Sequence, residues 1–156
     1  TVIATVSTDA KAARARDGGA DHVINYKSED VLARIREITG GAGLDHVVDV
    51  DFGGNLSVTI PALKNNGTLS YYATRGEWAP TFPAALVMSN NISIAGMVLP
   101  ASPHPARKRA QEDITHWIST GKRILNVAAT FPIEHTAEAH ELVETWTKDG
   151  TVVVEP

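Results

Sequence analysis

Short apolar runs alternate with helix-forming segments along the whole sequence. The first run, 2–6, is β-branched and continuous, which suits a parallel strand buried on both faces. Helix-capping residues follow at 7–9, then strong helix formers at 10–17 and two glycines that can end a helix. Strands that alternate with helices at this spacing need a parallel sheet covered on both faces. The pattern therefore predicts a doubly wound, Rossmann-like α/β fold.

The alternation continues to the end of the chain. Further strands are expected at 22–26, 44–50, 68–73, 91–99, 125–131 and 151–154. Further helices are expected at 31–38, 55–63, 80–89, from a loop at 100–105 to 119, and at 136–146. Ser28 is the expected cap of the second helix, and Asn66 and Gly67 are expected to form a turn.

The amino-acid composition excludes several classes of partner and binding site. A chain of 156 residues with 43% hydrophobic and 21% charged residues is typical of one compact domain. The formal net charge of -4 argues against nucleic acid or an anionic membrane as a partner. The absence of cysteine excludes disulfides and thiolate metal sites. No apolar run approaches the ~20 residues that cross a bilayer, and no signal-peptide pattern is present, so a cytoplasmic location is predicted by default.

Candidate ligand-binding residues lie where the expected strands end, because ligands bind beyond the carboxyl ends of strands in open α/β sheets. These windows are 7–11, 49–55, 73–76 and 97–101. Gly53, Gly54 and Gly76 would permit close approach of a dinucleotide, although glycines also serve ordinary turns. The glycine-rich 40–43 segment follows a helix, so it is interpreted as a helix terminator. The six histidines are scattered, and no metal site is predicted.

Several stretches together resemble a known family. They are 2–8, 19–26, 38–41, 44–50, 139–142 and 150–156. In this order they are similar to the carboxyl-terminal half of the medium-chain dehydrogenase/reductase superfamily, closest to its zinc-free, zeta-crystallin-like quinone oxidoreductases. The resemblance covers nearly the whole chain.

The resemblance implies that the chain is incomplete. Residues 2–6 match the family's second Rossmann strand, so the first strand and helix and the amino-terminal catalytic domain are expected to lie outside this chain. Residues 1–156 are then a partial dinucleotide-binding domain with a carboxyl-terminal tail, inactive alone. Loss of the central first strand should leave two strand edges unpaired. The full-length protein is expected to be a homodimer that pairs through 91–99.

The resemblance also implies NADPH as the cofactor, with NADH less favoured. Ser7 and Thr8 stand where NAD-preferring relatives carry an acidic residue. Lys11 and Tyr26 match a phosphate-binding lysine and tyrosine of the quinone reductases. The alternatives are a solvated helix lysine for Lys11 and a packing residue for Tyr26. Asp9 could approach the ribose and weaken the preference for a 2′-phosphate.

Other matched positions would surround the pyrophosphate and nicotinamide. They are Gly53, Asn55, Thr74, Arg75, Met97, Val98 and Leu99. Asn55 could instead be a helix cap, and 97–99 could be core. Ala73 replaces a glycine that relatives often carry, and Trp146 replaces a family arginine for which Lys148 is a possible substitute.

The reaction implied for the full-length protein is hydride transfer from NADPH to a small electron-poor alkene or quinone. No side chain of this chain need act as an acid or base, so no catalytic residue is predicted. Two alternatives remain. The chain could belong to a zinc-dependent alcohol dehydrogenase whose metal ligands lie elsewhere, or to a non-catalytic nucleotide-binding or structural module.

Overall fold

The computed structural model describes residues 1–121, 126–145, 148 and 150–156. The chain divides into two compact units, Thr1–Thr115 and His116–Pro156. Among the described residues, no helix is both long enough and apolar enough to cross a membrane.

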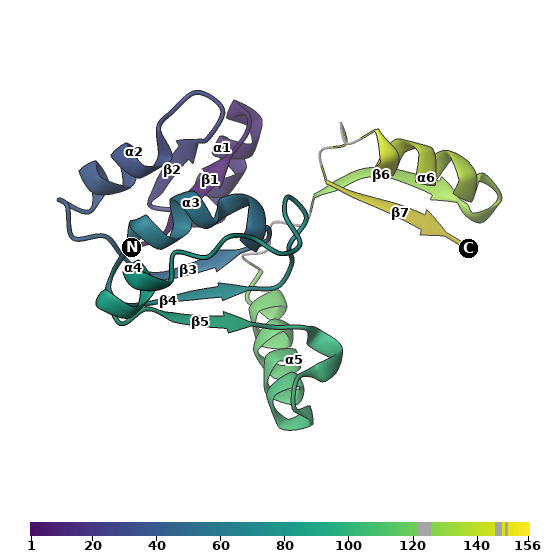
Figure 1. Cartoon of the computed structure of the whole chain (residues 1–156). Helices are drawn as coiled ribbons and strands as arrows, with labels where there is room; N and C mark the ends of the chain where they lie inside the picture. The colour runs from purple at the N-terminus through teal and green to yellow at the C-terminus, as the bar shows by residue number, and fades with distance from the viewer. Residues whose placement is uncertain (122–125, 146–147, 149) are drawn as a thin grey trace. The chain divides into compact units, whose positions relative to one another are not determined.

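The first unit consists of alternating strands and helices (Figure 1). In chain order they are β1 (Ile3–Val6), α1 (Asp9–Asp17), β2 (His22–Asn25), α2 (Val31–Ile38), β3 (Leu44–Asp49), α3 (Phe52–Ala62), β4 (Leu63–Tyr71), α4 (Ala84–Ser89), β5 (Ser93–Gly96), the 3-10 turn η1 (Leu99–Ala101) and α5 (His104–Ser119), whose last turn lies in the second unit. Strands β1 and β2 form one parallel sheet, and β3, β4 and β5 form another in that order. The parallel α/β class is therefore confirmed.

The second unit contains β6 (Val127–Pro132), the 3-10 turn η2 (Ile133–His135), α6 (Thr136–Glu144) and β7 (Thr151–Glu155). Its two strands pair in parallel. Both were expected, with slightly different ends. Helix α6 ends at Glu144, whereas the prediction extended to 146; Trp146 and the expected strand start at Leu125 lie outside the described residues.

Helix α3 joins the two hydrophobic clusters of the first unit. One cluster contains Leu56 and Ile60 of α3 with Leu63, Leu69 and Ile92. In the other cluster, Ala62 of α3 packs with Ile24 and Ile35. Helix α3 thus connects the β3-β4-β5 sheet with α2 and the β1-β2 sheet through buried apolar contacts.

The helix caps were partly predicted. Thr8 caps α1 as expected, and its Oγ1 accepts a hydrogen bond from the Lys11 N–H at 3.3 Å. The prediction of Ser28 as the cap of α2 was wrong. Asp30 caps that helix, with Oδ1 accepting from the Ala33 N–H at 3.0 Å. A carboxylate is an equally good N-cap, and Asp30 lies directly before the apolar face of the helix.

The start of α3 was also placed wrongly. The helix begins at Phe52 and not at 55, because the Phe52 N–H donates to the Ala73 carbonyl at 3.0 Å and Asp51 occupies the N-cap position. Asn55 is therefore inside the first turn, and the alternative that it caps the helix is wrong. Pro61 lies in the last turn, next to the final helical residue.

Prolines account for two further differences. Helix α4 begins at Ala84 and not at 80, directly after Pro83, whose fixed φ suits the entry to a helix. Strand β5 ends at Gly96, because the chain enters the turn η1, which contains Pro100.

Strand β4 begins at Leu63, five residues before the expected start, and keeps Asn66 in the left-handed region with φ 63°.

Among the described residues, strands β1 and β3 each pair on one side only, as do β2 and β5 at the other edges of the two sheets. Within the described ranges, β1 pairs with β2 alone and β3 pairs with β4 alone. This agrees with the expectation that a central strand of the family sheet is missing from the pairing.

Candidate functional site

Four predicted residues lie at the carboxyl ends of β1 and β2. The Lys11 Nζ donates to the Ser7 Oγ at 3.1 Å, and Thr8 caps the helix that carries Lys11. The N–H of Tyr26 donates to the Val6 carbonyl at 3.0 Å, which places Tyr26 beside the end of β1. The Tyr26 side chain is more than half exposed, so the alternative of a packing residue does not describe it.

This group fits a phosphate monoester. Lys11 supplies a cation, the Ser7 and Thr8 hydroxyls can donate hydrogen bonds, and the amino terminus of α1 carries the positive end of the helix dipole. Asp9 stands in the first turn of the same helix and is exposed. The Asp9 carboxylate, close in sequence, is the one acidic group among these residues and would repel a phosphate.

A second group forms where the loop after β4 meets the start of α3. Asp51 Oδ1 accepts from the N–H groups of Arg75 at 2.7 Å and Gly76 at 2.8 Å. The Gly76 and Arg75 N–H groups hold the pKa of Asp51 below its usual range. Thr74 Oγ1 accepts from the Gly53 N–H at 3.0 Å and donates to the Glu77 carbonyl at 2.8 Å. The structure thus brings Gly53, Thr74 and Arg75 together, and their contact with a cofactor stays a prediction.

The glycines at this junction have a packing role of their own. A Cβ on Gly53 would lie 1.9 Å from the Glu77 carbonyl oxygen, and one on Gly76 would lie 2.9 Å from the Gly54 Cα. Two backbone segments therefore touch where Gly53, Gly54 and Gly76 meet. The cofactor contact predicted for Gly53 stays a prediction beside this structural requirement.

Asp49, the last residue of β3, lies in the candidate window 49–55 but was not among the predicted site residues. Its side chain is 4% exposed, and Oδ1 accepts from the Asp51 N–H at 2.8 Å and from Asn55 Nδ2 at 2.9 Å. Its other oxygen, Oδ2, is buried and has no hydrogen-bond partner in the described part of the chain. A carboxylate at the end of an apolar strand was the available signal.

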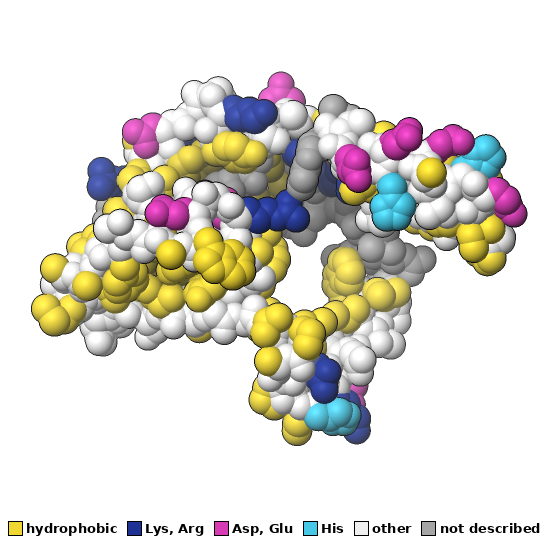
Figure 2. Space-filling model, turned by 45° about the vertical axis from the view of Figure 1, so that its right-hand side comes forward, with side chains coloured by type: hydrophobic (Ala, Val, Ile, Leu, Met, Phe, Trp, Pro, Cys, Tyr) yellow, Lys and Arg dark blue, Asp and Glu magenta, His cyan; other side chains and the backbone are white. Residues whose placement is uncertain are grey.

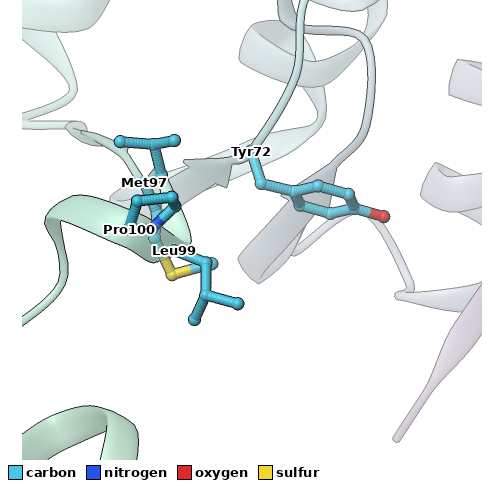
Figure 3. Close-up of a pocket in the computed structure, with 5 residues that line it drawn as sticks. Tyr72, Met97, Leu99 and Pro100 are labelled. Carbon is cyan, nitrogen blue, oxygen red and sulfur yellow. The ribbon is translucent and has the colours of Figure 1, made fainter.

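An open apolar hollow of about 450 Å³ lies after β4 and β5. It is lined by Tyr72, Met97, Val98, Leu99 and Pro100 (Figure 3). The Met97 N–H donates to the Tyr71 carbonyl at 2.9 Å and so holds the two strand ends together. Met97, Val98 and Leu99 are each more than half exposed, which rules out the alternative that they are core residues. Tyr72 was not among the predicted site residues.

Exposed apolar side chains are not confined to this hollow. Trp78 and Met88 of the first unit are also largely exposed. Figure 2 shows hydrophobic side chains open to solvent on the face that it presents. The apolar lining of the hollow is therefore one of several exposed apolar surfaces, and its position at the strand ends is what marks it as a candidate site.

The remaining predicted groups lie elsewhere. In the second unit, Lys148 Nζ donates to the Gly150 carbonyl at 2.8 Å, so its ammonium has a local partner. Across the described residues, no group of three or more His, Cys, Asp or Glu side chains could hold a metal ion.

The chain is similar to known proteins over nearly its whole length. The family model described as zinc-binding dehydrogenase matches residues 1–118. A 2-haloacrylate reductase of Burkholderia sp. is 32% identical, over 100% of this chain and 48% of its own length. Quinone oxidoreductase 1 of Escherichia coli (strain K12) is 26% identical, over 99% and 49%. A mycobacterial structure complexed with NADPH is 27% identical with a TM-score of 0.79, over 99% and 50%.

These matches also show the extent of the similarity. The chain spans about half the length of the curated relatives that it matches, consistent with their carboxyl-terminal, nucleotide-binding part. Because the family model covers most of the chain, the chain belongs to the zinc-binding dehydrogenase family of the medium-chain dehydrogenase/reductase superfamily.

Proposed function

We propose that this chain is the nucleotide-binding part of an NADPH-dependent oxidoreductase that reduces a small electron-poor alkene or quinone. The observation that carries the proposal is the group at the end of β1, where the Lys11 ammonium lies 3.1 Å from the Ser7 hydroxyl beside the Thr8 cap. The relatives are oxidoreductases by name, and one similar structure is complexed with NADPH.

Each group of the site has a separate task in this proposal. Ser7, Thr8, Lys11 and Tyr26 hold the 2′-phosphate and adenosine ribose. The junction of Asp51 with the 74–76 loop shapes the backbone along which the pyrophosphate lies. The hollow after β4 and β5 excludes water from one face of the nicotinamide. Bound NADPH would supply the hydride, and this chain orients and shields it.

The first experiment compares NADPH with NADH binding by the full-length protein, using nicotinamide fluorescence. Lys11→Ala should raise the Kd of NADPH about tenfold, because one charge-assisted contact to the phosphate is lost, and should leave NADH within about twofold. Lys64→Ala is the matched control. Lys64 pairs with Asp45 near the amino ends of β3 and β4, and its removal should change neither Kd.

Equal binding of both cofactors by the wild type would contradict the NADPH preference. A zinc-dependent alcohol dehydrogenase is the second candidate, favoured by the description of the matching family. Metal analysis of the full-length protein and NAD-linked oxidation of an alcohol would identify it. Cofactor binding without turnover of any acceptor would instead favour the non-catalytic module.

Two further properties are proposed with this function. A homodimer that pairs through 91–99 and a cytoplasmic location are both expected from the resemblance and the composition. Sedimentation of the full-length protein measures the first, and a monomer at micromolar concentration would contradict it.

A further inference from the structure

The hydrogen bonds of Asp49 fix the direction of a neighbouring amide. Asp49 Oδ1 accepts from the Asn55 side chain at 2.9 Å, and a carboxylate has no hydrogen to donate. The Asn55 group that faces Asp49 must therefore be the NH₂. Because the two arms of an amide point in different directions, the Asn55 carbonyl oxygen is turned away from Asp49.

The outward oxygen of Asn55 is available to a ligand. Asn55 is exposed, and no donor in the described part of the chain binds its Oδ1. Asn55 stands in the first turn of α3, at the carboxyl end of β3, which is where ligands approach an open α/β sheet. An amide oxygen accepts hydrogen bonds and repels phosphate, so its partner must be a hydroxyl or an N–H group.

The burial of the Asp49 carboxylate lowers the stability of the folded protein. The side chain is 4% exposed, and Oδ2 is buried without a partner. A half-satisfied buried carboxylate destabilises a fold, and such exceptions to local rules occur at functional sites. The Asp51 N–H and the Asn55 NH₂ both donate to the same oxygen of Asp49, so an asparagine at 49 could keep both hydrogen bonds. Alanine at 49 removes this acceptor, so the amide of Asn55 would be free to turn.

We propose that Asp49 is a positioning residue that holds the Asn55 amide with its oxygen outward, so that Asn55 accepts a hydrogen bond from the nicotinamide nucleoside of NADPH. The donor is a ribose hydroxyl or the carboxamide NH₂. The inference rests on the proposed function. It adds a hydrogen bond that recognises the nicotinamide nucleoside of the cofactor and not its phosphates.

The test is a double-mutant cycle in the full-length protein, with Kd measured by calorimetry. Asp49→Ala and Asn55→Ala should each raise the Kd of NADPH about fivefold to tenfold, as loss of one hydrogen bond does. Neither should change the Kd of 2′-phospho-ADP, which lacks the nicotinamide nucleoside. The double variant should bind NADPH no more weakly than Asn55→Ala, because Asp49 acts through Asn55.

Two further arms complete the design. Asp45→Ala removes the same carboxylate from an exposed position of β3 and should leave the Kd of NADPH unchanged. The 3-acetylpyridine analogue of NADPH keeps the ribose hydroxyls and lacks the carboxamide NH₂. An undiminished loss in Asn55→Ala with this analogue assigns the hydroxyl as the donor, and no loss assigns the carboxamide.

The outcomes separate the two proposals. Additive losses in the double variant, equal weakening of both ligands, or less than a twofold change in NADPH affinity would overturn the role of Asp49. Failure of the wild type to bind NADPH or 2′-phospho-ADP would instead overturn the proposed function, and this inference with it.

Discussion

Asp51 connects two segments that are distant in sequence. Its Oδ1 accepts from the N–H groups of Arg75 and Gly76, while its own N–H donates to Asp49. One carboxylate thus ties the start of α3 to the loop after β4. The charged form of Asp51 is the form that these donors stabilise.

The first prediction follows from the lowered pKa of Asp51. A depressed folded-state pKa contributes stability that is complete above the unfolded pKa of about 4 and is lost as pH falls through the folded pKa. Asp51→Asn should lower the Tm at pH 7 and flatten its decline below about pH 4. Calorimetry between pH 7 and 3 measures this. If the Tm values of the two proteins fell in parallel below about pH 4, the role of Asp51 would be contradicted.

The second prediction concerns the contact between backbones. Gly53→Ala places a Cβ 1.9 Å from the Glu77 carbonyl oxygen, and a backbone oxygen has little room to move. Helix propensity alone would favour alanine by about 1 kcal/mol, yet we expect net destabilisation of about 1–3 kcal/mol. Urea unfolding measures it. Ser57→Ala, at an exposed position of the same helix, is the control and should change little.

Residue-level prediction worked where the determinant is local. The cap at Thr8 and the closeness of Ser7 to Lys11 follow from a few adjacent residues. Asp49 lay in a candidate window but was not named as a site residue, because its importance depends on burial and on Asn55, which only the folded chain brings to it. The cofactor contacts of the site residues stay predictions, since no contact within the chain measures them.

At the scale of elements, α3 is the main connection of the first unit. It supplies buried residues to both hydrophobic clusters and, through its first turn, the contacts with Asp49 and the 74–76 loop. The same helix therefore links the core to the candidate cofactor edge. A loss of its packing should weaken the site as well as the fold.

A third prediction tests this link. Ile60 is 0% exposed on α3, and Ile60→Ala should destabilise the protein by about 2–5 kcal/mol through lost burial and a cavity. Val48→Ala, at a position 73% exposed on β3, should cost within about 0.5 kcal/mol. Chemical denaturation compares the two. Equal costs would contradict the assigned core.

Element order was predictable from the sequence, and element boundaries were less so. The alternation of apolar runs and helix formers predicted every strand of the first unit, because hydrophobic periodicity reports burial directly. The start of α3 at Phe52 depends on the Ala73 carbonyl, which lies far along the chain. The early end of β5 depends on the turn that contains Pro100.

For the whole molecule, strand pairing decides which regions are held most firmly. In the described ranges, β4 is bonded on both sides, whereas β1, β3 and β5 are each bonded on one. A strand with partners on both sides can separate only if the hydrogen bonds to both neighbouring strands break, so it opens less often than an edge strand. The unpaired edges of β1 and β3 are the expected sites for further pairing.

The fourth prediction is a ranking of hydrogen exchange. Peptides from β4 should exchange more slowly than those from β1 or β5, because opening β4 requires breaking two ladders. Exchange followed by mass spectrometry measures the order in the 156-residue chain. Strong protection of β1, comparable with β4, would show that its second edge is paired by another strand.

Each ladder of the first unit joins two strands that are separated by a single crossover. This arrangement affects how the chain can fold during its synthesis. Ile3 pairs with His22, Leu44 with Leu63 and Leu69 with Ile94, so in these three ladders the partners lie close in sequence. Ribosomes extend a chain by about 5–20 residues per second, so each partner leaves the exit tunnel within seconds of the strand it joins. The sheets can therefore assemble one crossover at a time while translation continues, with α3 joining them once Ala62 has emerged.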